Sequence, residues 1–206
     1  MNLRKSPYLA VACLLWVLLA GGGFAWLVRY EFSAGSAAAA PLSWPEPSGI
    51  ERAPDRPTLV MFAHPRCPCT RASVGELARL MARCKDRAHV AVLFFRPKGS
   101  EQDWTQTDLW RSAASIPGVI ARWDEDGVEA KRFHSTTSGQ VLLYDVSGRL
   151  QFEGGITASR AHEGDNAGRS ALVAILTDGK SGGLRTPVFG CSISDPERAS
   201  QIQPQP

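Results

Sequence analysis

The sequence predicts one α/β domain, built on a central and mostly parallel sheet, behind a single apolar segment. Two short apolar runs, TLVMFA at 58–63 and HVAVLFF at 89–95, are typical of buried parallel strands. A helical pattern follows each run, and strands that alternate with helices predict a sheet with helices on both faces. The chain has 206 residues, which one membrane segment and one domain of roughly 150 residues would use up.

The helices are predicted from apolar spacing and from the residues that end them. In the segment 70–86, Val74, Leu77 and Met81 recur at helical spacing and give one apolar face. The next helix stops before Pro117, because the residue before a proline disfavours helical backbone. The predicted helices are 70–86, 105–116, a short one at 127–133, and 166–177, with Gly179 just past the last.

Three further strands complete the predicted sheet. The segment 118–123 is a third strand after the second helix. The segments 140–145 (QVLLYD) and 149–153 (RLQFE) flank the turn at 146–148 (VSG), which predicts an antiparallel hairpin at one side of the sheet. The resulting order is β-α-β-α-β-(α)-β-β-α.

Composition excludes several classes of protein. Apolar residues make up 44% and charged residues 21%, which is typical of a globular domain and not of a disordered chain or a polytopic membrane protein. The net charge is only +3 and the basic residues are scattered, so nucleic-acid binding is not predicted. Five cysteines are too few for a disulfide scaffold.

The first 32 residues are predicted to be a cytoplasmic stub and a transmembrane anchor. Residues 8–28 carry no charge, and 21 helical residues span a hydrocarbon core about 30 Å thick. Arg4 and Lys5 precede this run, which favours an N-terminus in the cytoplasm of a bacterium and a domain outside its inner membrane. A cleaved signal peptide ending in the small residues of 33–40 is the alternative. Both interpretations export the domain to an oxidising compartment.

The rest of the chain divides into three parts. Residues 33–57 are rich in alanine, serine and proline and are predicted to be a semi-extended linker. Residues 58–193 form the folded domain, and residues 194–206 form a polar, disordered tail.

The predicted chemistry lies where the first strand gives way to the first helix of the domain. This connection reads His64-Pro65-Arg66-Cys67-Pro68-Cys69-Thr70. A helix N-terminus presents free N–H groups and partial positive charge, which stabilise a thiolate and make it reactive at neutral pH. Arg66 and Arg71 add positive charge nearby. Cys67 and Cys69 are therefore placed for thiol–disulfide exchange.

A strand ending in Phe-Ala, then three residues, Cys-Pro-Cys and an amphipathic helix, resembles the thioredoxin-like superfamily. The segment 138–157 resembles its closing hairpin. More narrowly, the chain is similar to bacterial membrane-anchored thioredoxin-like redox proteins, with a resemblance that covers about residues 58–178. The resemblance implies a thioredoxin-like fold and a thiol–disulfide oxidoreductase that needs no cofactor. It also implies exported proteins bearing thiols or disulfides as partners, Cys67 as attacking thiol and Cys69 as resolving thiol. An alignment anchored on Pro68-Cys69 leaves open which of the two attacks first.

The sequence departs from the superfamily pattern in two places. The usual motif has two residues between the cysteines, whereas here Pro68 alone separates them, and a disulfide closed over so short a span is strained. The superfamily usually has a cis-proline before its fourth strand, but residues 136–139 read TTSG.

The remaining cysteines have competing interpretations. Cys13 lies in the membrane segment, and Cys84 falls on the apolar face of the first domain helix, where a buried core thiol is expected. Cys191 follows the last helix. It could pair with Cys84, approach Cys67 and Cys69 as a third redox or metal ligand, or stay unpaired.

Other polar residues are possible members of the same site. His64 could tune the thiolate, and His134 lies near the expected cis-proline region. Arg160 and His162 lie in the polar segment 154–168, which is either a functional loop or a set of turns closed by a cap at Asp165 or Asn166.

The alternative function is a copper-binding assembly factor on the same fold. Its ligands would be Cys67, Cys69 and His64, because thiolates and imidazole suit Cu(I). A peroxidase would need an arginine beside the cysteine, such as Arg66 or Arg160, but the motif that surrounds such a cysteine is missing.

Overall fold

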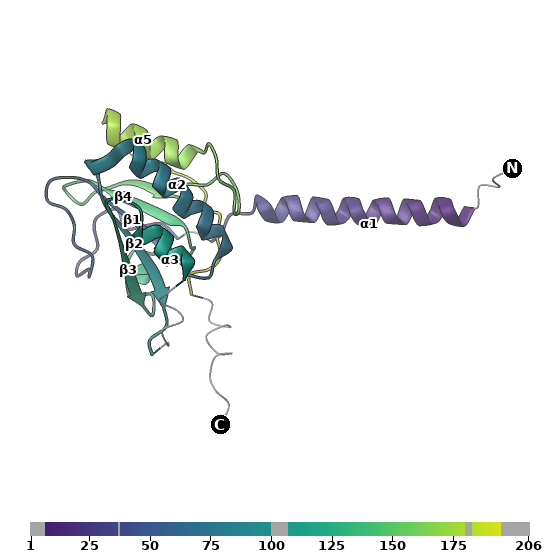
Figure 1. Ribbon diagram of the computed structural model, residues 1–206, viewed down its shortest axis with the longest axis horizontal. Helices are drawn as coiled ribbons and strands as arrows, with labels where there is room; N and C mark the ends of the chain where they lie inside the picture. The colour runs from purple at the N-terminus through teal and green to yellow at the C-terminus, as the bar shows by residue number, and fades with distance from the viewer. Residues whose placement is uncertain (1–6, 37, 100–106, 180–182, 195–206) are drawn as a thin grey trace, which may run out of the picture. The chain divides into compact units, whose positions relative to one another are not determined.

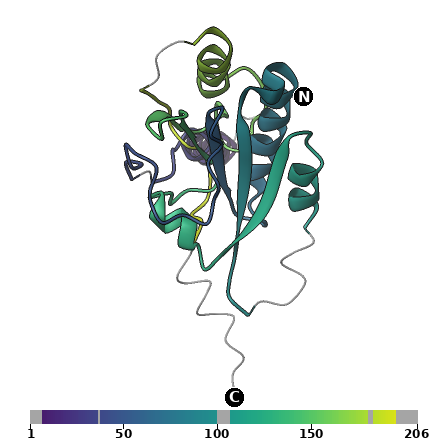
Figure 2. The same ribbon diagram turned by 90° about the vertical axis from the view of Figure 1, so that its left-hand side faces the viewer.

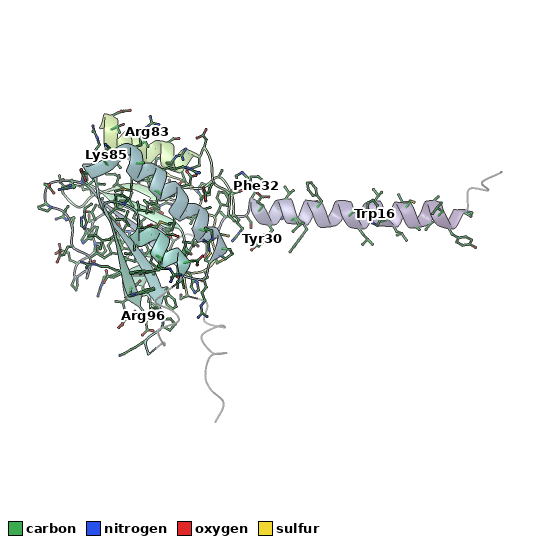
Figure 3. All side chains as sticks on the ribbon, viewed as in Figure 1. Trp16, Tyr30, Phe32, Arg83, Lys85 and Arg96 are labelled. Carbon is green, nitrogen blue, oxygen red and sulfur yellow. The ribbon has the colours of Figure 1, made fainter. Side chains whose placement is uncertain are left out.

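The computed structural model describes residues 7–36, 38–99, 107–179 and 183–194, and the chain divides into two compact units, 1–33 and 34–206. In the first unit, helix α1 (Pro7–Glu31) has 25 residues and is long and apolar enough to cross a membrane, as a signal sequence can also be. None of its described residues is buried, and Figure 3 shows side chains such as Trp16 projecting from it. The predicted apolar helix is confirmed.

The second unit contains a six-stranded mixed sheet (Figure 1) in the order β3-β2-β1-β4-β5-β6. Strands β1, β2 and β3 are parallel, whereas β4 is antiparallel to both β1 and β5. The strands are β1 (Thr58–Ala63), β2 (His89–Arg96), β3 (Val119–Glu125), β4 (Gln140–Tyr144), β5 (Leu150–Gly154) and β6 (Leu184–Arg185). The predicted hairpin is present, and β6 is a two-residue strand that the sequence pattern does not reveal.

Helices cover both faces of this sheet (Figures 1 and 2), and the core alternates between them with the two-residue period of the strands. Leu59 and Met61 pack into the cluster beneath the long helices, whereas Val60 and Phe62 pack on the opposite face. The helices are α2 (Pro68–Cys84), the 3-10 turn η1 (Lys85–Arg87), α3 (Asp108–Ala114), α4 (Val128–Arg132) and α5 (Ala167–Asp178). The predicted central mixed sheet with helices on both faces is confirmed.

The predicted linker differs from a free tether, because part of it packs on the second face of the sheet. Ala40 and Ile50 are buried there, and the Trp44 ring meets Tyr144 edge-on at 5.2 Å. The Tyr144 hydroxyl donates to the Pro41 carbonyl oxygen at 2.9 Å. Helix α4 has only five residues, so the linker supplies apolar cover that the helix cannot. The predicted tail lies outside the described residues from 195 onward.

Candidate active site

Cys67 is the residue before α2, in the short connection that follows the carboxyl end of β1. Its backbone is extended (φ −87°, ψ 116°), and Pro68 begins the helix at a position where a missing N–H breaks no helical bond. The Cys67 N–H donates to the His64 carbonyl at 3.1 Å, and the Cys67 carbonyl accepts from the Thr70 N–H at 3.2 Å. These two backbone hydrogen bonds therefore fix the position of Cys67 at the start of α2.

A third thiol joins the predicted pair. The sulfur atoms of Cys67, Cys69 and Cys191 all lie within 4.8 Å of one another. Cys67 and Cys69 are 4% and 6% exposed, whereas Cys191 is half-buried. Within the described residues, this is the group of side chains that could hold a metal ion. We call these three residues the thiol cluster.

The C-terminal segment, residues 190–193, brings Cys191 to the cluster by pairing with the loop before β4. The Ser138 N–H donates to the Cys191 carbonyl at 2.8 Å, and the Ile193 N–H donates to the Thr136 carbonyl at 2.9 Å. An antiparallel bridge joins Thr137 to Ser192 between these two bonds. The C-terminal segment therefore adds a short extended strand to the loop that the sequence analysis noted for its missing proline.

Close packing fixes the approach of this segment. A Cβ added at Gly190 would lie 1.8 Å from the Ser138 carbonyl oxygen, so glycine is the residue that fits. On the other side of the same loop, the Ser138 hydroxyl accepts from the His64 N–H at 2.7 Å and is hydrogen-bonded to the Thr70 hydroxyl. Ser138 and Thr70 are fully buried and were not identified from the sequence.

The cluster holds one thiolate and two thiols at neutral pH. A hydrogen bond from the Cys191 thiol, with smaller help from Thr70, lowers the pKa of Cys67 to about 4 despite its burial. The same hydrogen bond, together with burial, raises the pKa of Cys191. Burial and the negative charge of Cys67 raise the pKa of Cys69, an effect that Arg160 partly offsets. The negative charge of the cluster therefore resides on Cys67.

Arg160 connects the cluster to the polar loop 154–168. One of its guanidinium nitrogens donates to the Gly190 carbonyl oxygen at 2.8 Å, and its hydrogen bonding and positive charge partly offset the rise in the pKa of the Cys69 thiol. Arg160 is thus the member of the predicted loop that reaches the thiols. His162 is exposed and lies outside the thiol cluster.

A buried carboxylate that the sequence analysis missed holds this loop in place. Glu76, on α2, is fully buried and accepts from the Gly164 N–H at 2.8 Å and the Asn166 side-chain amide at 3.2 Å. It also forms ion pairs with Arg79 and Arg169. Asn166 caps α5 by accepting from the Arg169 N–H at 2.7 Å, so the cap expected at Asp165 or Asn166 belongs to Asn166.

The structure does not bring His64 into the cluster. Its ring stacks on Phe95 with centroids 5.9 Å apart, and its Nδ1 accepts from the Arg66 N–H at 3.2 Å. The copper ligand set Cys67, Cys69 and His64 is therefore corrected: the third group beside the two cysteines is Cys191.

Two other predicted residues are exposed and are not members of the thiol cluster. His134 is exposed, and its Nδ1 is 3.0 Å from the Ala39 carbonyl oxygen in the linker. Arg66 is exposed at the surface beside Cys67.

Cys84 is too far from Cys191 to pair with it. Cys84 lies fifteen positions after Cys69 on the same helix, which is about 22 Å along the axis of α2. Figure 3 labels Arg83 and Lys85, the neighbours of Cys84, at the end of α2 that is remote from the cluster. Cys84 is a free thiol buried in the core, as its place on the apolar helix face predicts.

No family model matches the sequence, and no curated protein matches it. Among solved structures, an uncharacterised conserved protein from Geobacillus kaustophilus is 19% identical, with a TM-score of 0.55 over 80% of this chain and 93% of that one. A hypothetical protein from Sinorhizobium meliloti is 23% identical (TM-score 0.49; 78% and 93% covered), and a secreted disulfide oxidoreductase from Mycobacterium tuberculosis is 15% identical (0.43; 60% and 81%). The likeness to the Geobacillus protein shows a shared fold.

Proposed function

We propose that the chain is a membrane-anchored, extracytoplasmic thiol–disulfide oxidoreductase in which Cys67 is the attacking sulfur. The observation that carries this proposal is the thiol cluster at the N-terminus of α2, where Cys67 has two further sulfurs within reach. A structural thiol needs neither a helix N-terminus nor neighbouring thiols, whereas disulfide exchange uses both.

The reaction needs only the residues of the cluster and a partner. The Cys67 thiolate attacks one sulfur of a partner's disulfide, and the other partner sulfur leaves as a thiolate. A second thiol of the cluster then attacks the mixed disulfide at Cys67 and releases the partner. The partners are exported proteins bearing thiols or disulfides. The resemblance noted in the sequence implies Cys69 in this role, and the structure adds Cys191 as a second thiol within reach.

The membrane anchor defines where this reaction takes place. Helix α1 is long enough to span the bilayer, and Arg4 and Lys5 favour a cytoplasmic N-terminus. The domain then lies in an oxidising compartment close to the inner membrane, where disulfides persist.

The test is a redox titration of the full chain in detergent micelles. The protein is equilibrated in buffers of graded thiol–disulfide ratio, alkylated, and analysed by mass spectrometry. We expect Cys67 to enter a disulfide reversibly with one midpoint, while Cys84 stays alkylatable as a thiol once the protein is unfolded. If Cys67 remains a thiol, or remains bridged, across the whole range, the proposal is wrong.

A second candidate is Cu(I) binding, which the convergence of three sulfurs favours. Thiolates are soft ligands that select Cu(I), and the spread of the cluster sulfurs leaves room for one ion among them. Titration of the reduced chain with Cu(I) against a chelator should then give one bound ion per chain. Cys191→Ser should lower the affinity at least tenfold, and His64→Ala should not. Unchanged affinity in Cys191→Ser would reject this ligand set.

A further inference from the structure

We propose that Cys191, and not Cys69, resolves the mixed disulfide formed at Cys67. This inference rests on the proposed oxidoreductase function and names the second catalytic residue of its site. It assigns to the C-terminal segment, residues 190–193, the delivery of the resolving thiol.

Geometry disfavours Cys69 in this role. Cys67 and Cys69 are two positions apart with only Pro68 between them, and the proline ring fixes φ at the first position of α2. The two sulfurs lie within 4.8 Å of each other, but a disulfide between them would close a small, strained ring at the start of the helix.

The position of Cys191 meets the requirements that Cys69 does not. Its sulfur lies within 4.8 Å of the Cys67 sulfur that it must attack, and its hydrogen bond to Cys67 is the main cause of the lowered pKa of that thiol. It reaches Cys67 from a separate segment, and a Cys67–Cys191 disulfide therefore needs no small ring. Extended pairing with residues 136–138 holds the segment as an added strand, in the way that sheet edges bind peptides.

The same segment explains how Cys67 can be both protected and reactive. Cys67 is 4% exposed, and Cys191 is the more exposed of the two. A partner sulfur can reach Cys67 when the C-terminal segment shifts from the loop 136–138. When the segment returns, Cys191 is placed against the new disulfide. Protection of the thiolate and resolution of the mixed disulfide are thus one motion.

The step balances within the protein and its partner. The Cys191 thiol gives its proton to the partner sulfur that departs, and its own sulfur bonds to the Cys67 sulfur as the bond from Cys67 to the partner breaks. The partner's disulfide is reduced to one thiol and one thiolate, which takes its proton from water, and Cys67 and Cys191 are oxidised to one disulfide. Run in reverse, the same steps transfer a disulfide to a partner dithiol.

The experiment follows the mixed disulfide in the full chain in detergent micelles, with a metal chelator present and oxidised glutathione as the probe. Trypsin cleaves after Arg66, Arg71, Arg185 and Arg198, so Cys67 and Cys69 share one short peptide and Cys191 lies in another. Wild type, Cys69→Ser and Cys191→Ser are compared by acid quenching and mass spectrometry. Ser192→Ala is the matched control, because Ser192 is exposed and its hydroxyl donates to the Ser194 carbonyl oxygen at 2.9 Å.

We expect glutathionylated Cys67 to persist at least tenfold longer in Cys191→Ser than in wild type. In Cys69→Ser and in Ser192→Ala it should resolve within about threefold of the wild-type rate, and in Cys69→Ser the products should include the two tryptic peptides joined by a disulfide. Persistence in Cys69→Ser with normal resolution in Cys191→Ser would overturn the assignment and leave the oxidoreductase proposal standing. If no variant forms a glutathione adduct at Cys67, the proposed function itself fails.

Discussion

Gly190→Ala should detach the C-terminal segment from the loop before β4 while leaving every sulfur in the chain. The added Cβ would lie 1.8 Å from the Ser138 carbonyl oxygen, whereas Cβ atoms essentially never approach a backbone atom closer than 3.0 Å. The two segments must therefore move apart by at least about 1.2 Å. The bond from the Ser138 N–H to the Cys191 carbonyl, now 2.8 Å, would lengthen to about 4 Å and break.

The consequence is a loss of the hydrogen bond that the Cys191 thiol gives to Cys67. That bond is the main cause of the lowered pKa of Cys67, so the pKa should move from about 4 toward the value of a free cysteine, about 8.5. Overpacking of this kind costs about 1–3 kcal/mol of unfolding free energy. The domain should therefore stay folded while its thiolate is lost at mildly acidic pH.

The assay is the rate of alkylation of Cys67 by iodoacetamide as a function of pH, read by mass spectrometry. The ratio of the rate at pH 5 to the rate at pH 9 should fall at least tenfold in Gly190→Ala. This ratio cancels changes in access to the buried sulfur. Gly148→Ala is the control: its left-handed backbone (φ +82°) makes it destabilising, and its turn lies at the opposite end of the sheet from Cys67.

A Gly190→Ala variant that unfolds at a lower urea concentration but keeps the wild-type ratio would refute the reasoning. It would show that the Cys67 thiolate owes its stability to the helix N-terminus alone. An equal loss of the ratio in Gly148→Ala would refute it in another way, since the effect would then follow from general destabilisation.

Three further results are expected. In wild type, the alkylation rate of Cys67 should stay level from pH 8 to pH 5 and fall near pH 4, because the sulfur is deprotonated above its pKa of about 4. Glu76→Ala should lower the unfolding free energy by about 3–5 kcal/mol in urea titrations, because the mostly buried Arg169 loses its buried partner and keeps the exposed Asp165, whereas the exposed Glu163→Ala should cost under about 0.5 kcal/mol. The full chain should stay in membranes after an alkaline wash, and deletion of residues 1–32 should release it; a shorter mature chain in membrane-free extract would instead indicate a cleaved signal.

The strands and long helices could be predicted because their signals are local. An apolar run such as 58–63 is buried on both faces of the sheet, and the period of α2 marks one face for the core. The start of α2 differs from prediction by two residues, because Pro68 occupies the first helical position. The packing of the linker was not predicted, since Trp44 and Ile50 are separated by prolines and follow no period.

The candidate site could be predicted only where it is local in sequence. Cys67 and Cys69 stand at a strand-to-helix junction that a motif reveals, whereas Cys191 lies 122 residues beyond Cys69 and no spacing relates them. The pairing of residues 190–193 with the loop before β4 places Cys191 in the site. In the sequence, the one indication of this role is a cysteine in a short apolar segment after the last helix. Glu76 carried a signal as well, since it is an acid beside Leu77 on the apolar face of α2.

The position of the thiolate depends on residues that never touch its sulfur. Glu76 fixes the loop 154–168, Arg160 in that loop holds the Gly190 carbonyl, and Gly190 allows Cys191 to face Cys67. Each link is a hydrogen bond or a packing contact between segments far apart in the sequence, so a change at any of them alters the cluster from a distance. The links are expected to differ in their contribution: Glu76→Ala should mainly lower folding stability, whereas Gly190→Ala should mainly raise the pKa of Cys67. For each variant, the unfolding free energy measures the contribution of a residue to folding stability. The pH 5 to pH 9 alkylation ratio measures its contribution to keeping Cys67 deprotonated, so the two measurements together distinguish these roles.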